Sequence, residues 1–188
     1  MTCYGAKEMR ASFDTVRRNT ITLAEEIPAE RYDFRAAPGC RSAGEMLAHV
    51  AVAPMWQIDL HGSHVDRVDF ERFGAHLAEA AAAERALNTK EAIVQALRDN
   101  GERLSEFFGS LTNATLEELV SFPPPIQPPV KTRFEMLLGI KEHEMHHRGQ
   151  LMLIERMIGI VPHLTRAREA FRAPVTSGVQ AAGGARIG

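Results

Sequence analysis

Three histidines lie within five residues, in the run His143-Glu144-Met145-His146-His147. On a helix His143 and His147 are four positions apart, so their imidazoles project side by side from one face. Two imidazoles buried together are unfavourable unless something occupies the space between them. A divalent metal does so well, because neutral imidazole is a common nitrogen ligand of zinc, nickel and copper. The spacing therefore predicts a metal site; the alternative is a pair of histidines at the core rim that form ordinary hydrogen bonds.

The face that carries the pair is otherwise mostly apolar, and we therefore expect it to point toward a core. It continues through Met136, Ile140, Gln150, Leu151 and Ile154.

A catalytic site needs a third protein ligand and an open coordination position. His49 is the best candidate, because it is flanked by small and apolar residues in Glu45-Met46-Leu47-Ala48-His49-Val50-Ala51. A single histidine on an apolar helix face is otherwise more typical of a core residue with its own hydrogen bonds. His146 is expected near the site or at the surface. The remaining histidines fall at expected helix ends or in loops, where we expect solvent exposure: His61, His64, His76 and His163.

The same run also spells His-Glu-x-x-His, the zincin peptidase pattern, in which Glu144 would be the general base. The surrounding sequence does not extend that pattern, since metzincins continue with glycine and histidine where this chain has Gln150 and Leu153. Glu144 is either a catalytic base or a surface charge paired with Arg148 one turn on. Gln150 is either a hydrogen-bond donor to substrate or ligand, or an ordinary helix residue.

Four segments with helical periodicity must position these residues. We expect helices over about 6–27, from Ser42 to an end at His61-Gly62-Ser63, from Thr89 to 111 and over 132–158, with Gly159 as the stop signal. The alanine-rich part of 66–88 is either a short helix or an extended connection, and 115–119 is one helical turn. A proline-rich run over 121–129 predicts a stiff linker, and the tail from Pro174 an arm without a pattern of its own. These elements predict an all-α four-helix bundle over 1–173 and a C-terminal arm over 174–188.

Composition sets limits on the class of protein. The chain has 188 residues, of which 45% are hydrophobic and 24% charged, as is usual for one globular domain. The net charge of −2 offers no basic excess to neutralise a phosphate backbone, which argues against nucleic-acid binding. No stretch is apolar enough to span a bilayer, and Cys3 and Cys40 form no disulfide framework, so we expect a cytoplasmic protein. Trp56, the single tryptophan, is expected in the core or in a pocket wall.

Two motifs resemble the DinB-like superfamily of metalloenzymes. They are Ser42-Ala43-Gly44-Glu45-Met46-Leu47-Ala48-His49-Val50-Ala51 and His143-Glu144-Met145-His146-His147-Arg148-Gly149-Gln150-Leu151. Together with the helical pattern the likeness covers about residues 6–160. It implies an up-down-down-up bundle and a divalent metal, zinc or nickel, held by His49, His143 and His147.

The resemblance also implies a reaction class. Members with known activity include transferases that use a low-molecular-weight thiol, and a few are linked to isomerase or hydrolase chemistry; the family commonly forms dimers. We therefore expect a small-molecule substrate, a homodimer, and a thiol S-transferase or hydrolase. Two alternatives stay open, a metal-binding or stress-response bundle without catalysis and a zincin-like peptidase. The long connection at 62–88, the proline-rich segment and the arm depart from the family pattern, so the substrate cannot be carried over.

Overall fold

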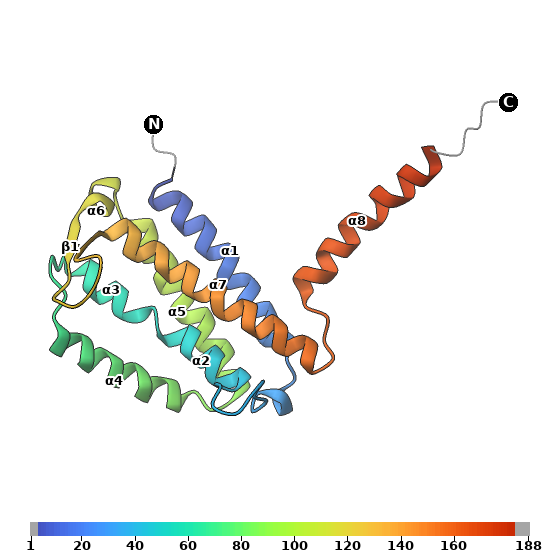
Figure 1. Cartoon of the computed structure of the whole chain (residues 1–188), viewed down its shortest axis with the longest axis horizontal. Coiled ribbons are helices and arrows are strands. Elements are labelled where there is room, and N and C mark those ends of the chain that lie inside the picture. Colours follow the sequence, from blue (N-terminus) through green and yellow to red (C-terminus); the bar gives the residue numbers. More distant parts are fainter. Residues whose placement is uncertain (1–3, 183–188) are drawn as a thin grey trace.

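The computed structural model describes residues 4–182, and that range is mostly helical. Its centre is a bundle of α1 (Ala6–Glu26), α2 (Ala43–Val52), α5 (Lys90–Ser110) and α7 (Arg133–Met157). Helices α1 and α7 run in one direction and α2 and α5 in the opposite direction (Figure 1). The up-down-down-up four-helix bundle predicted from the sequence is therefore confirmed.

The predicted helix boundaries rest on local hydrogen bonds. The Ser42 hydroxyl accepts from the Glu45 N–H at 3.2 Å, and the Glu45 carboxylate accepts from the Ser42 N–H at 2.8 Å, which completes a capping box. The Thr89 hydroxyl accepts from the Ala92 N–H in the same way. Gly159 has a φ of +88°, a conformation that glycine adopts at little cost, and it follows the last residues of α7.

The helix expected to run from Ser42 to residues 61–63 ends at Gly62 as predicted, but it is broken in two. Helix α2 ends at Val52, and α3 (Met55–Gly62) begins directly after Pro54. Proline has no N–H to donate and its ring collides with the preceding turn, which accounts for the interruption at this position.

The segment at 66–88, for which the sequence left a short helix and an extended connection open, contains a long helix, α4 (Phe70–Ala86). The Asp69 carboxylate caps the first N–H groups of this helix. None of its residues is fully buried, and it lies beside α2, outside the bundle (Figure 1). Helix α4 provides the return path between α2 and α5, which run in parallel.

The proline-rich segment is the loop of a small hairpin and not a free linker. Strands β1 (Leu119–Ser121) and β2 (Val130–Thr132) pair antiparallel, with Val120 opposite Lys131. Before the hairpin, α6 (Asn113–Glu117) supplies the helical turn expected near 115–119, and a 3-10 turn, η1 (Ala29–Arg31), lies between α1 and α2. The hairpin leads directly into α7, so it fixes where that helix starts.

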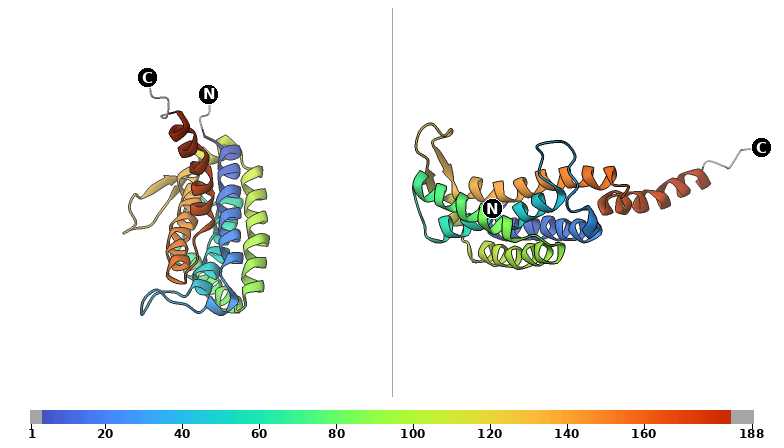
Figure 2. Two further views of the ribbon diagram at one scale, coloured as in Figure 1. Left: turned by 90° about the vertical axis from the view of Figure 1, so that its right-hand side faces the viewer. Right: turned by 90° about the horizontal axis from the view of Figure 1, so that it is seen from below.

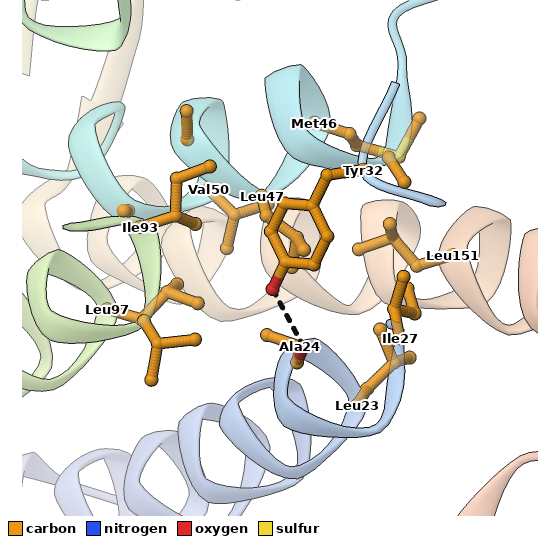
Figure 3. Packing of buried hydrophobic residues seen from close by; sticks show 14 of the residues in the cluster. Leu23, Ala24, Ile27, Tyr32, Met46, Leu47, Val50, Ile93, Leu97 and Leu151 are labelled. Carbon is orange, nitrogen blue, oxygen red and sulfur yellow. Dashed lines mark hydrogen bonds between the residues drawn. The ribbon is translucent and has the colours of Figure 1, made fainter. Parts of the chain in front are cut away.

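All four bundle helices contribute to the core (Figure 3). Leu23, Leu47, Leu97 and Leu151, one from each helix, are completely buried. The Tyr32 hydroxyl enters the same cluster and donates to the Ala24 carbonyl at 2.7 Å, so its polar end is satisfied. This packing holds α2 and α7 side by side, as a site made from both helices requires.

Helix α8 (His163–Ala182) extends away from the bundle (Figures 1 and 2). It begins well before Pro174 and continues past it without a break, so the predicted C-terminal arm is helical up to Ala182 and starts earlier than residue 174. The remaining residues of the arm, 183–188, and Cys3 lie outside the described residues. Within residues 4–182, no helix is both long and apolar enough to cross a membrane.

Candidate metal centre

The three predicted ligands come together between α2 and α7. His49 projects from α2, while His143 and His147 project from successive turns of α7. The Nε2 atom of His143 lies 3.1 Å from the Nε2 atoms of both His49 and His147. One ring nitrogen from each residue lies within 4.8 Å of the others, the only such cluster of metal-ligating groups in residues 4–182.

The donor set suits a divalent metal. Nitrogens that each lie about 2.1 Å from a tetrahedral zinc are about 3.4 Å apart, close to the spacing seen here. Burial and the neighbouring imidazoles lower the pKa of His143 to about 4, and burial also lowers the pKa of His147. Both rings are therefore neutral near pH 7, so their lone pairs are free for a metal.

Hydrogen bonds on the far side of two rings fix their orientation. The His49 Nδ1–H donates to the Glu84 carboxylate at 2.8 Å, and Arg41 donates to the other oxygen of Glu84 at 3.2 Å. The His147 Nδ1–H donates to the Gln150 side-chain oxygen at 2.9 Å. Such partners select the tautomer that leaves Nε2 free to ligate and raise the basicity of the ring.

Glu144 lies in neither of the two places expected for it. It is 1% exposed, so it is not a surface charge paired with Arg148, and it does not line the cavity described below. Instead its two oxygens accept from the Arg17 guanidinium of α1, at 2.8 to 3.1 Å. The structure therefore gives Glu144 a position in the core of the bundle, away from the reacting end of the site.

Three further histidines, His61, His76 and His163, differ from the expectation of solvent exposure; both ring nitrogens of His163 are buried. His61 is 1% exposed, with its Nδ1 accepting from Arg133 and its Nε2–H donating to Gln57. Burial and the Arg133 charge lower the pKa of His61 to about 4. His76 lies on α4 and lines the cavity beside the metal centre, whereas His146 is exposed and accepts a hydrogen bond from Gln150.

A cavity of about 500 Å³ adjoins the histidines. His49 and His143 form part of its wall, together with residues from α3, α4 and α7. A volume of this size is typical of small-molecule sites. Two of the three clustered imidazoles thus lie at the wall of a cavity large enough for a small molecule.

Glu84 and Arg41 are the site residues that the sequence analysis missed. Both line the cavity, and Glu84 is bonded to a predicted ligand. The only sequence signal was that Glu84 shares a helical face with Phe73, Leu77 and Ala80, which is visible only once 70–86 is taken as a helix.

An up-down-down-up bundle with three converging imidazoles beside a cavity defines a class of helical proteins with a metal-binding site. Residues 12–151 match the DinB superfamily, and because this match covers well over half of the sequence, the chain belongs to that superfamily. No curated protein sequence matches the chain.

Two solved structures share the fold. A DinB-like protein from Bacillus subtilis, YjoA, is 20% identical, with a TM-score of 0.60 over 81% of this chain and 92% of that one. YfiT from Bacillus subtilis is 13% identical, with a TM-score of 0.64 over 85% and 91%. YfiT is described as a probable metal-dependent hydrolase with an unusual four-helix bundle topology. At these identities the likeness establishes the fold.

Proposed function

We propose that this protein is a divalent-metal-dependent hydrolase of a small molecule. The observation that carries the proposal is the convergence of His49, His143 and His147 beside a cavity of substrate size, whose wall includes His49 and His143. The three imidazoles would hold a divalent metal, which would supply a nucleophile near neutral pH by lowering the pKa of water. The description of YfiT as a probable metal-dependent hydrolase supports the same class.

The chain's own residues have distinct parts in this proposal. His49, His143 and His147 hold the metal, with zinc or nickel as our expectation. Glu84 and Gln150 fix the rings of His49 and His147 through the Nδ1–H groups. In this arrangement Gln150 acts through His147, and Glu144 is not the base.

Thiol S-transfer is the second candidate, because the same open position would also acidify a thiol. A low-molecular-weight thiol cofactor therefore stays a prediction. The peptidase alternative loses support, since Glu144 is bonded to Arg17 in the core and the two-stranded hairpin is the only sheet within residues 4–182. The remaining alternative is a metal-binding bundle without catalysis. Protein that binds metal but turns over no substrate would support it.

Metal content tests the site directly. We expect about one metal per chain by elemental mass spectrometry of untagged protein, and loss of that metal in His143→Ala. His64→Ala is the control, because His64 is exposed and lies outside the nitrogen cluster. Equal metal content in both variants would show that the ligands are wrongly assigned.

Glu84→Gln tests the role of the carboxylate that accepts the hydrogen bond from His49 Nδ1. Loss of such a carboxylate lowers metal affinity by about 10- to 100-fold. Glu79→Gln, an exposed change on the same helix, should leave affinity unchanged.

Metal-loaded protein is then assayed on a panel of esters and amides with and without added thiols. Turnover that needs a thiol would favour the transferase.

A further inference from the structure

One face of α4 forms a long wall of the cavity beside the metal centre. The lining residues of this helix recur at helical spacing and therefore share one face. Eleven residues separate Phe73 at one end of the wall from Glu84 at the other, which corresponds to about 16 Å. We call this cavity the α4 slot, and its α4 wall consists of Phe73, His76, Leu77, Ala80, Ala81 and Glu84.

The two ends of the α4 slot differ in polarity. Glu84 is bonded to His49 and Arg41, so that end is polar and holds the metal centre. At the other end the rings of Phe73 and Trp56 pack edge to face, with centroids 5.3 Å apart.

Helix α7 supplies the opposite wall in the same order. His143 lies at the metal end, and Ile140, Gly139 and Met136 follow toward the aromatic end. His143 and Met136 are seven positions apart, which corresponds to about 10 Å along the helix. An apolar passage of that length therefore leads away from the histidines.

Few polar groups interrupt this passage. The side-chain oxygen of Gln57 already accepts from His61, and His76 lies 3.6 Å from the Glu79 carboxylate. Along α4 the intervening Leu77, Ala80 and Ala81 offer no hydrogen-bonding side chain, and the two alanines leave the passage wide. Such walls favour methylenes or an aromatic ring over a hydroxylated ligand.

We propose that the α4 slot binds a small molecule with an unbranched apolar chain, whose polar head lies at the histidines and whose tail extends toward Trp56 and Phe73. This inference rests on the proposed function for the role of the head group. The tail site depends only on the walls. The substrate class is accordingly an ester, amide or related derivative of a medium-length chain.

Gly139 provides a way to block the slot without disturbing the fold. A Cβ added at Gly139 meets no atom within 4 Å, although this residue lines the slot. Gly139→Leu therefore fills the passage, and it replaces glycine in a helix by a better helix former. Gly149→Leu is the matched control, since Gly149 is exposed on the same helix, has equal room and lies outside the slot.

The test uses straight-chain hydroxamic acids, from acetohydroxamic to decanohydroxamic acid, on metal-loaded protein. Binding is followed by the fluorescence of Trp56, the single tryptophan, and by calorimetry. We expect affinity to rise about fourfold per added methylene until the chain outgrows the slot. Gly139→Leu should remove this dependence but still bind acetohydroxamic acid, and Gly149→Leu should match the wild type.

The outcomes separate the slot from the metal. If acetohydroxamic acid binds and longer chains bind no better, the slot proposal is wrong and the metal site stands. If the protein holds no metal, n-alkanols of the same lengths are titrated into metal-free protein. A chain-length dependence blocked by Gly139→Leu then supports the slot while the proposed function fails, and its absence overturns the slot as well.

Discussion

The Arg17–Glu144 ion pair crosses the core of the bundle and predicts a large loss of stability when one partner is removed. The side chains are 5% and 1% exposed, and Arg17 also donates to the carbonyls of Leu97 at 2.8 Å and Val50 at 3.3 Å. In Glu144→Leu the buried guanidinium keeps only these two carbonyl acceptors. Removing one member of a buried pair costs about 3–5 kcal/mol, because the other charge is left uncompensated.

For a domain of this size such a loss corresponds to a fall of about 6–20 °C in the unfolding midpoint. Thermal and urea unfolding followed by circular dichroism measure it, with the exposed Glu142→Leu as the control on the same helix. The double variant Arg17→Met with Glu144→Leu should be more stable than either single variant, since no charge remains buried.

A catalytic role for Glu144 makes the opposite prediction. Glu144→Gln would then remove turnover and leave the unfolding midpoint where it was. That result, or a Glu144→Leu variant as stable as Glu142→Leu, would refute the assignment of Glu144 to the core.

Two further predictions concern α7 and α8. Burial and the neighbouring Glu26 raise the pKa of Glu155 to about 7, so folding opposes its ionisation. The stability that the protein loses through Glu155 should therefore grow as pH rises from about 4.5 to 7. In urea unfolding, Glu155→Gln should be more stable than the wild type at pH 8 but not at pH 4. An equal difference in stability at both pH values would contradict the raised pKa. Phe171 is 78% exposed on α8 and Met157 is 49% exposed near the end of α7, which leads us to expect that these apolar side chains are covered in a homodimer. Light scattering should show a dimer that Phe171→Asp weakens, with Glu169→Asp as the control; a wild-type monomer would refute this.

The sequence was sufficient for features set by local geometry. The pair His143 and His147 shares a face because four residues make about one helical turn, whatever lies around the helix. The cap at Ser42 and the stop at Gly159 also depend only on neighbouring backbone groups. From such local patterns the sequence predicts both the helical bundle and the three histidines that the structure brings together.

Features set by distant partners could not be predicted. Glu144 has Arg148 one turn away, but its partner is Arg17, 127 positions earlier in the chain. Glu84 reaches His49 only because α4 packs beside α2, and an alanine-rich helix carries little information on where it will lie. The break at Pro54 is different, because it follows from a local signal: a proline interrupts the hydrogen bonding of a helix.

Helix α4 buries none of its residues completely, and yet it supplies one whole wall of the slot and the carboxylate behind His49. Substitutions on a surface helix usually change stability by less than about 0.5 kcal/mol. The wall can therefore vary one residue at a time, during evolution or by design, while the core of the bundle stays intact and keeps the histidines in place. If the slot binds substrate as proposed, preference for one substrate over another could be altered on α4 without rebuilding the bundle that holds the histidines.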